Sequence, residues 1–295
     1  MRALLIPLLL ATGACTGDSP RQLETSAAQQ DLAVRMAGIE AASGGRLGLA
    51  LHAPDRGVIY AYRGDERFAM CSTFKLALAG MMLDTPGLRD KRLAFGAQDI
   101  LSYAPYAKDR AALGWMSGLE AAHHAVILSD NTAANLLLAE VGGPEGFTRW
   151  LRALGDKTTR LDRNEPTLNE NAPGDPRDTA TPAAHAALVD TLLWGGRLPQ
   201  ADRALLQTWL VETTTGMNRL RGGLPVEWLA GDKTGTCGTG EQGEVNDIAM
   251  IVTPGGNRYI LAAYLDGANG PVSDSEASLA EAAKAIAEWL QQMGA

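Results

Sequence analysis

The sequence predicts an α/β (α+β) fold in which an antiparallel sheet, flanked by N- and C-terminal helices, carries an inserted all-helical domain. Segments with strand-like alternation of apolar residues concentrate near the two ends of the chain, and helical apolar spacing occurs at both termini. The middle of the chain lacks that alternation and is rich in Ala, Leu and Met. We therefore expect residues 23–70 and 213–295 to form one discontinuous sheet-and-helix domain, and residues 71–212 to form the helical domain.

Residues 1–22 are expected to be an export leader. Met1 and Arg2 precede an apolar run from Ala3 to Ala11, which is too short to span a bilayer. Cys15 would carry a lipid if this were a lipoprotein leader, and would be discarded with an ordinary secretory leader. In either case we expect a periplasmic or secreted protein.

The first elements after the leader are a helix and a hairpin. Leu32, Met36 and Ile39 recur at helical spacing, which predicts a helix over about residues 31–42. Alternating residues at 47–51 and again at 58–62 flank a turn-like stretch rich in Pro, Asp and Gly, so we expect a β-hairpin there.

The middle and the end of the chain follow the same reasoning. Helical patterns cover residues 119–128, 132–141 and 144–154, and strands are expected at 248–252 and 259–264 around a turn. A final helix is predicted up to about residue 293, with Ser273 and Glu276 spaced as a capping box at its start.

Composition excludes several classes of partner. The chain has 295 residues, of which 46% are hydrophobic and 20% are charged, so it can bury a substantial core. Its formal net charge of −8 would repel phosphate backbones. We expect no nucleic-acid partner, no transmembrane segment and a monomer.

The folded part contains two cysteines, Cys71 and Cys237. An even pair in an oxidising compartment predicts a disulfide bond between them.

Three short motifs carry the chemistry, and the first is the S-x-x-K pattern of Ser72 and Lys75. At the start of a helix these side chains lie one turn apart, where a lysine can accept or relay the proton of a nucleophilic serine. The pattern alone occurs by chance about once in a chain of this size, so an exposed serine and lysine remain the alternative.

The second motif is Ser129-Asp130-Asn131, between two apolar helical segments. Ser129 could pass a proton to a leaving nitrogen, and Asn131 could bind a substrate amide. All three residue types also favour helix N-caps, which is the structural alternative.

The third motif is Lys233-Thr234-Gly235, followed by Thr236, on an expected strand. A cation and two hydroxyls can hold a substrate carboxylate, and glycine allows a ligand close to the backbone. Asp232 precedes the lysine where a phosphate-binding loop requires glycine, so nucleotide binding is excluded.

In this order, S-x-x-K, S-D-N and K-T-G resemble the signature of class A β-lactamases and penicillin-binding proteins, over nearly the whole chain from about residue 31. The resemblance implies a serine enzyme that opens a β-lactam ring through an acyl-enzyme on Ser72. It also assigns an oxyanion hole to the backbone N–H groups of Ser72 and Thr236, and places Tyr103 at the rim of the cleft. Either Lys75 or Glu165 would take the serine proton.

Residues 163–178 resemble the omega loop of class A enzymes. In that family a glutamate and an asparagine matching Glu165 and Asn169 hold the water that hydrolyses the acyl-enzyme. The residues matching Arg163 and Asp178 form a salt bridge across the base of the loop. A solvated loop charge is the alternative for Glu165. No cofactor and no metal are expected, because His52 and His185 are isolated and His123 and His124 would diverge on a helix.

Two features also resemble the carbapenem-hydrolysing branch of class A. One is the cysteine pair, and the other is Arg219, which would supply positive charge beside Thr234 and Thr236. A solvated surface arginine is the alternative. We therefore expect hydrolysis of penicillins, cephalosporins and carbapenems; a D-Ala-D-Ala peptidase or a non-catalytic β-lactam sensor are the competing functions.

Overall fold

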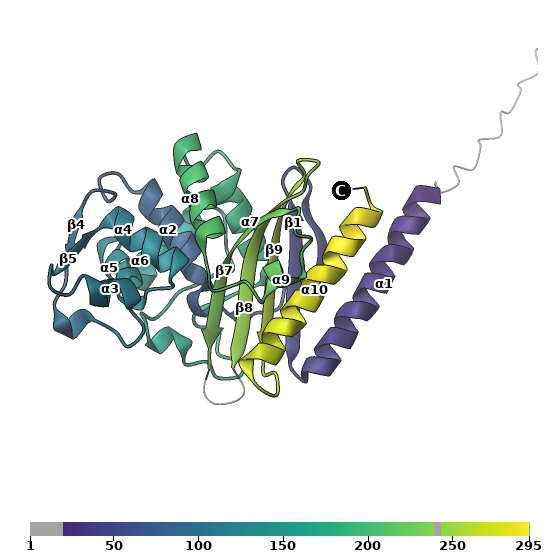
Figure 1. The fold of residues 1–295 in the computed structure, drawn as a ribbon, viewed down its shortest axis with the longest axis horizontal. Coiled ribbons are helices and arrows are strands. Elements are labelled where there is room, and N and C mark those ends of the chain that lie inside the picture. The colour runs from purple at the N-terminus through teal and green to yellow at the C-terminus, as the bar shows by residue number, and fades with distance from the viewer. Residues whose placement is uncertain (1–19, 239–242, 295) are drawn as a thin grey trace, which may run out of the picture.

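The computed structural model describes residues 20–238 and 243–294, so most of the expected leader, including Cys15, lies outside the described residues. Its centre is a five-stranded antiparallel sheet in the order β2-β1-β9-β8-β7 (Figure 1). The strands are β1 (Arg46–Ala53), β2 (Gly57–Tyr62), β7 (Leu229–Cys237), β8 (Glu244–Val252) and β9 (Arg258–Asp266). The expected fold class and both hairpins are confirmed.

Helices from the two chain ends cover one face of the sheet. They are α1 (Pro20–Ser43) and α10 (Val272–Gln292), seen to the right of the sheet in Figure 1. The short α9 (Leu220–Gly223), from a later part of the chain's middle, packs beside α10. Leu49, Leu261 and Ala249 point from the sheet into this layer and pack with Ile286 of α10. The outer core therefore joins segments from the beginning and the end of the chain.

The other face of the sheet is covered by helices from the middle of the chain (Figure 1). Of these, α7 (Pro182–Leu193) and α8 (Gln200–Glu212) pack on the strands themselves. Farther from the sheet, the helical part continues with α2 (Phe74–Asp84), α3 (Pro105–Asp109), α4 (Gly118–Ile127), α5 (Asn131–Glu140) and α6 (Gly143–Ala153). Ile248, Ile260 and Tyr264 of the sheet belong to the same buried cluster as Leu78 of α2. The inner core thus continues from the sheet into the helical part without a break.

The middle of the chain also contains short strands, so the expectation of an all-helical segment is wrong in detail. β3 (Phe68–Ala69) pairs with β6 (Thr179–Ala180), and β4 (Arg92–Ala94) pairs with β5 (Trp115–Ser117). Two or three residues are too few to show a period of two. The β3–β6 pair joins the segment before Cys71 to the end of the omega loop. Single 3₁₀ turns occur at η1 (Cys71–Thr73), η2 (Ala97–Asp99) and η3 (Thr167–Asn169).

Two helix starts differ from expectation. α1 begins at Pro20, eleven residues before Asp31, because residues 21–37 contain neither Gly nor Pro to end a helix. The capping box at Ser273 and Glu276 is wrong: Pro271 occupies the N-cap, and no side chain caps the helix. Ser273 donates to Asp274 instead, which leaves Glu276 available for another partner.

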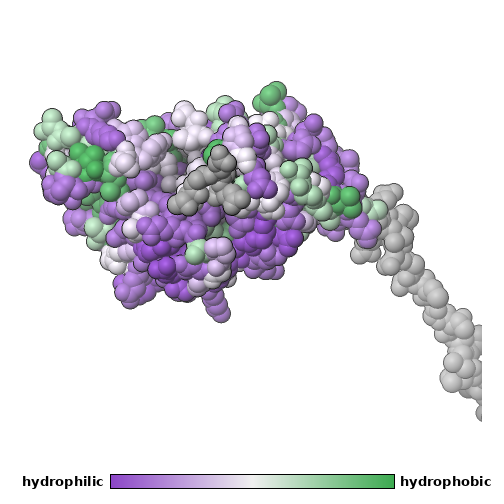
Figure 2. All heavy atoms as spheres, turned by 90° about the horizontal axis from the view of Figure 1, so that it is seen from below, coloured by the Kyte–Doolittle hydropathy of each residue, from purple (hydrophilic) through white to green (hydrophobic). Residues whose placement is uncertain are grey.

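None of the helices in the described part of the chain is both long enough and apolar enough to cross a membrane. Figure 2 shows the molecule from below the view of Figure 1, where most of the visible surface is hydrophilic and hydrophobic residues form small separate areas.

Candidate active site

Ser72 and Lys75 lie where the helical layer meets the edge strand β7. Cys71 has a left-handed backbone (φ +48°) and opens the 3₁₀ turn that carries Ser72 directly into α2. Lys75 Nζ donates to Ser72 Oγ at 2.8 Å, so the helical spacing does bring the pair together. Ser72 is half-buried, whereas Lys75 is wholly enclosed.

In the Ser129-Asp130-Asn131 segment, one residue caps a helix and the other two contact Lys75. Asp130 is the N-cap of α5 and accepts from Ala133 N at 2.8 Å, so the capping alternative holds for this residue. Ser129 (φ +58°) and Asn131 turn toward Lys75 Nζ, which donates to Ser129 O at 3.0 Å and to Asn131 Oδ1 at 2.5 Å.

Lys233 and its neighbours line the site from β7. Lys233 Nζ donates to Ser129 Oγ at 3.2 Å, and Lys75 Nζ lies 3.4 Å from the same oxygen. The hydroxyl of Ser129 therefore lies between the side-chain nitrogens of two lysines. Thr234 is buried, and its hydroxyl is 2.7 Å from that of Thr215, whereas Thr236 is exposed.

Gly235 has a different structural role from the expected one. A Cβ at this position would lie 2.7 Å from the carbonyl oxygen of Met70 and 3.2 Å from Cβ of Cys71. Glycine is thus needed because β7 packs directly on the nucleophile segment, whether or not a ligand also approaches.

Glu165 reaches into the site from the omega loop. Its Oε1 is 2.9 Å from Lys75 Nζ and 3.5 Å from Ser72 Oγ, and its side chain is wholly shielded from solvent. Asn169 Nδ2 donates to Glu165 Oε2 at 2.6 Å. The buried Oδ1 of Asn169 has no protein partner among the described residues, which leaves an acceptor beside the carboxylate.

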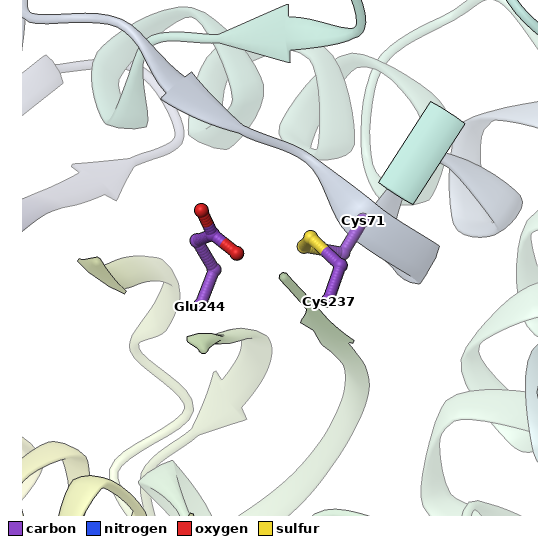
Figure 3. Close-up of side chains that lie close together, drawn as sticks. All are labelled: Cys71, Cys237 and Glu244. Atoms are coloured by element: carbon purple, nitrogen blue, oxygen red, sulfur yellow. A yellow bond between two sulfur atoms is a disulfide. The ribbon is translucent and has the colours of Figure 1, made fainter. Parts of the chain in front are cut away.

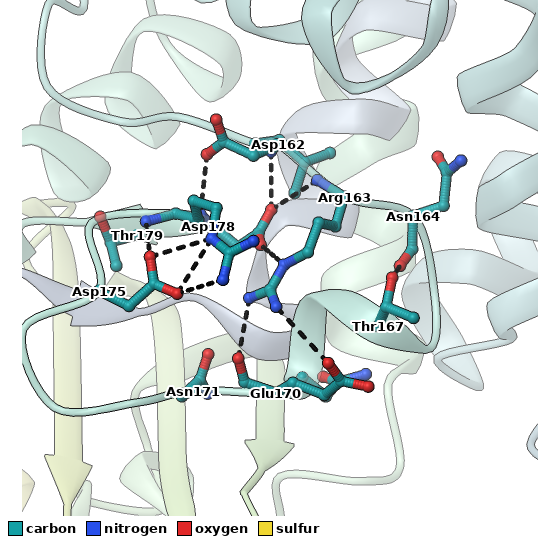
Figure 4. A network of polar contacts seen from close by, with 12 residues as sticks. Asp162, Arg163, Asn164, Thr167, Glu170, Asn171, Asp175, Asp178 and Thr179 are labelled. Atoms are coloured by element: carbon teal, nitrogen blue, oxygen red, sulfur yellow. Dashed lines mark hydrogen bonds and ion pairs between the residues drawn. The ribbon is translucent and has the colours of Figure 1, made fainter.

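The base of the omega loop is closed by Arg163 and Asp178 (Figure 4). Arg163 Nε donates to Asp178 Oδ2 at 2.6 Å, and the backbone N–H groups of Asp162 and Arg163 donate to Asp178 Oδ1 at 2.7 and 2.9 Å. Asp178 is fully buried. Its charge is satisfied by three donors, which fixes the two ends of the loop together.

Two asparagines hold the loop in ways that the sequence did not reveal. Asn135 of α5 makes a reciprocal pair with the backbone of Glu165, donating to its carbonyl at 2.8 Å and accepting from its N–H at 3.0 Å. Asn171 Nδ2 donates to Cys237 Sγ at 2.9 Å. Neither residue belongs to a motif, and isolated asparagines carry no recognisable sequence signal.

Cys71 and Cys237 form the expected disulfide, with a Cα–Cα distance of 5.5 Å (Figure 3). Asn246 braces the same region, since its Nδ2 donates to Ala69 O at 2.8 Å. In the described residues, one group of potential metal ligands is found, the two cysteines with Glu244. Because the sulfurs are bonded to one another, they are not thiolate ligands.

Arg219 is buried against the back of β7 and is not a solvated surface arginine. Its Nη1 donates to Gly235 O and to Asn246 O, each at 2.8 Å, and its Nη2 donates to Thr236 Oγ1 at 2.7 Å. Glu276 of α10 pairs with Nε at 3.1 Å. The guanidinium thus contacts Thr236 directly, while Thr234 is bonded to Thr215.

Burial sets the titration of the charged groups. It lowers the pKa of Lys75, although Glu165 opposes this, and it lowers the pKa of Lys233 well below the usual range with help from Lys75. Burial also raises the pKa of Asp247 well above its usual range, reinforced by Asp232. Burial thus disfavours the charged form of each of these groups, including the protonated form of Lys75.

Tyr103 is 53% exposed, and its carbonyl oxygen accepts from the N–H of Asn131 at 3.0 Å. Its backbone thus adjoins the site while its ring faces solvent. The structure brings together around Ser72 the side chains of Lys75, Ser129, Asn131, Glu165, Asn169 and Lys233. The Arg163–Asp178 bridge lies apart from them, at the base of the omega loop.

Comparisons with known proteins agree with this arrangement. The model of the beta-lactamase enzyme family matches residues 30–290. A beta-lactamase of Mycobacterium tuberculosis (strain ATCC 25177 / H37Ra) is 44% identical over 89% of this chain and 87% of its own length. Beta-lactamase CTX-M-8 of Citrobacter amalonaticus is 40% identical over 98% of this chain and 99% of its own.

Solved structures give the same result. A structure of an ancestral (GNCA) class A beta-lactamase has a TM-score of 0.83 and 46% identity, and covers 87% of this chain and 99% of that one. With a family match over most of the chain and relatives well above 30% identity, the chain belongs to the beta-lactamase enzyme family, as a class A β-lactamase that hydrolyses β-lactams.

Proposed function

We propose that this β-lactamase acts through a serine acyl-enzyme on Ser72. The observation that carries the proposal is the meeting of Ser72 Oγ, Lys75 Nζ and Glu165 Oε1 within 3.5 Å of one another. A nucleophile with two potential bases at hydrogen-bond distance is the arrangement that acyl transfer requires.

Lys75 is the proposed proton acceptor during acylation. Its Nζ lies 2.8 Å from Ser72 Oγ, against 3.5 Å for Glu165 Oε1. Burial lowers the pKa of Lys75, which favours the neutral amine needed for a base. Ser129, bonded to both buried lysines, would then return a proton to the leaving nitrogen of the opened ring.

Glu165 and Asn169 are the proposed holders of the deacylating water. The carboxylate and the amide oxygen of Asn169, which has no partner in the described part of the chain, present two acceptors side by side. This arrangement suits a water that gives its proton to Glu165. The backbone N–H groups of Ser72 and Thr236 would stabilise the oxyanion formed in both steps.

Substrate recognition would use side chains of β7 together with Arg219, which is bonded to that strand. Lys233, Thr234 and Thr236 would hold the substrate carboxylate, with the Arg219 charge acting through Thr236. Asn131 would bind the amide of the substrate side chain, and Tyr103 would line the rim. These assignments need no cofactor and no metal.

Penicillins, cephalosporins and carbapenems are the proposed substrates. Support for carbapenems comes from the disulfide beside the nucleophile and from the buried Arg219, the two features that resemble the carbapenem-hydrolysing branch. We also propose that the enzyme works as a monomer in the periplasm or outside the cell, with residues 1–22 as its leader.

Steady-state hydrolysis of benzylpenicillin, a cephalosporin and imipenem, with and without a chelator, tests this function. We expect turnover of all three, unchanged by the chelator. Stoichiometric acylation without turnover would instead indicate a penicillin-binding peptidase or a sensor. A long-lived adduct with imipenem alone would remove carbapenems from the substrates.

A further inference from the structure

A second polar cavity, of about 380 Å³, lies away from the nucleophile, between α6 and the segment that leads into the omega loop. Four cationic residues line it, Arg67, Arg152, Lys157 and Arg160, together with two carboxylates, Glu145 and Asp162. It shares none of the residues placed around Ser72. On a chain whose net charge is −8, four cations around one small cavity are a local reversal of charge.

Both carboxylates of this cavity already have cationic partners. Asp162 is bonded by Arg160, with Nε at 2.9 Å and Nη2 at 2.5 Å from its two oxygens. Glu145 extends into solvent and pairs with Arg149 one helical turn away, at 2.7 Å. Arg67, Arg152 and Lys157 form no ion pair with any carboxylate in the described part of the chain.

The two unpaired guanidiniums are nevertheless held in place by neutral acceptors. Arg67 Nη1 donates to Thr158 O and to Thr179 Oγ1, each at 2.9 Å. Arg152 Nη1 donates to Asp156 O at 2.6 Å and to Thr159 O at 2.7 Å. These bonds fix the forks through one nitrogen each and leave their charge uncompensated.

We propose that this cavity, the Arg67–Arg152 pocket, binds a small phosphate-type anion such as inorganic pyrophosphate. Guanidinium forks match the paired oxygens of a phosphoryl group, and Lys157 adds a mobile point charge. The volume falls at the lower end of the range for small-molecule sites, which fits a compact anion.

The pocket borders the base of the omega loop. The carboxylate of Asp162, which is the partner of Arg160, also accepts from the backbone N–H of Asp178 at 3.1 Å. In return, the backbone N–H of Asp162 donates to the carboxylate of Asp178 (Figure 4). A bound anion would therefore lie one ion pair away from the residues that close the loop.

Calorimetric titration of the whole protein with sodium pyrophosphate in about 20 mM and about 200 mM NaCl tests the proposal. We expect one bound anion, with affinity that falls at the higher salt concentration because screening weakens the attraction. The double variant Arg67→Gln/Arg152→Gln should bind at least about tenfold more weakly, from the loss of two charge-assisted contacts.

A matched control is Arg56→Gln/Arg92→Gln, which removes the same net charge from exposed residues outside the pocket and should change affinity less than about twofold. Because Arg67 and Arg152 also hold backbone oxygens, Lys157→Gln serves as a second variant that breaks no structural bond. It should weaken binding without lowering the melting temperature.

Four results would overturn the proposal. One is the absence of pyrophosphate binding by the parent, and another is equal binding by the parent and all the variants. Binding that persists in the pocket variants and competes with benzylpenicillin hydrolysis would place the anion in the cleft beside Ser72. Arginine-dependent binding to phosphatidylglycerol vesicles without binding of pyrophosphate would identify a lipid headgroup instead.

Discussion

Arg219 of the α8–α9 connection and Glu276 of α10 form an ion pair, Nε to Oε1 at 3.1 Å, behind the strand that carries Lys233. The pair connects the outer helical layer to the substrate side of β7, because the same guanidinium donates to Thr236 Oγ1. Arg219 is thus a fixed charge and not a mobile one.

Replacing this arginine should impair turnover. Arg219→Ala removes the donor to Thr236, and we expect kcat/KM for benzylpenicillin and for imipenem to fall by the equivalent of about 1.5–3 kcal/mol. Glu276→Gln keeps the guanidinium in contact with β7 and should have a smaller effect. Unchanged kcat/KM for both substrates in Arg219→Ala would remove the arginine from substrate recognition.

The disulfide should contribute to stability. It closes a loop of 166 positions, for which chain entropy gives roughly 5 kcal/mol, although measured values lie nearer 2–4 kcal/mol. We expect the free energy of unfolding of Cys71→Ser/Cys237→Ser, measured in urea, to be about 2–4 kcal/mol below that of the parent. Two titratable thiols in unreduced, denatured protein lacking residues 1–22 would show that the bond does not form.

The ion pair at the base of the omega loop should contribute far more to the free energy of unfolding than an exposed ion pair nearby. Arg163→Ala leaves the buried Asp178 carboxylate without its cation, and we expect the free energy of unfolding to fall by up to about 3–5 kcal/mol. The control is Arg177→Ala on the same loop, whose pair with Asp175 is exposed and should contribute less than about 1 kcal/mol. Equal effects in the two variants would contradict a structural role for the Arg163–Asp178 bridge.

His185 should make the fold sensitive to acid. Burial lowers its pKa to about 4, and its Nδ1 is 2.5 Å from the hydroxyl of Tyr264. The unfolded chain takes up a proton near pH 6.5, whereas the folded protein does so only near pH 4, so stability is lost as pH falls between these values. From pH 7.5 to 4.5 the loss from this group is about 2–3 kcal/mol.

Urea unfolding of the parent and of His185→Gln at these two pH values measures that contribution. The variant should lose less stability on acidification than the parent, by about the same amount. Identical losses would show that His185 does not titrate as its burial implies.

Motifs found in the sequence correspond to most of the site, because each motif residue is held by local geometry. Ser72 and Lys75 meet through one helical turn, and Lys233 to Thr236 share one strand. Side-chain contacts between segments that are distant in the chain produce no recognisable pattern in the sequence. Asn135, Asn171 and Glu276 each act on a residue 30 to 66 positions away, through partners chosen by the tertiary fold.

The fold shows the same division. The hairpins and long helices have apolar spacing that a sequence displays, whereas β3 to β6 are too short to show any. Glu276 looked like half of a capping box because local spacing was the visible signal, and its true partner is Arg219.

The most direct test of the mechanism is the intact mass of Glu165→Gln after mixing with benzylpenicillin. If Glu165 activates the deacylating water, the variant should still acylate on Ser72 but fail to release the product, because glutamine cannot accept a proton. The account predicts a covalent adduct of one benzylpenicillin per protein that persists while the parent has already returned to its free mass. A Glu165→Gln variant that turns over benzylpenicillin at the parent rate, with no adduct, would contradict it.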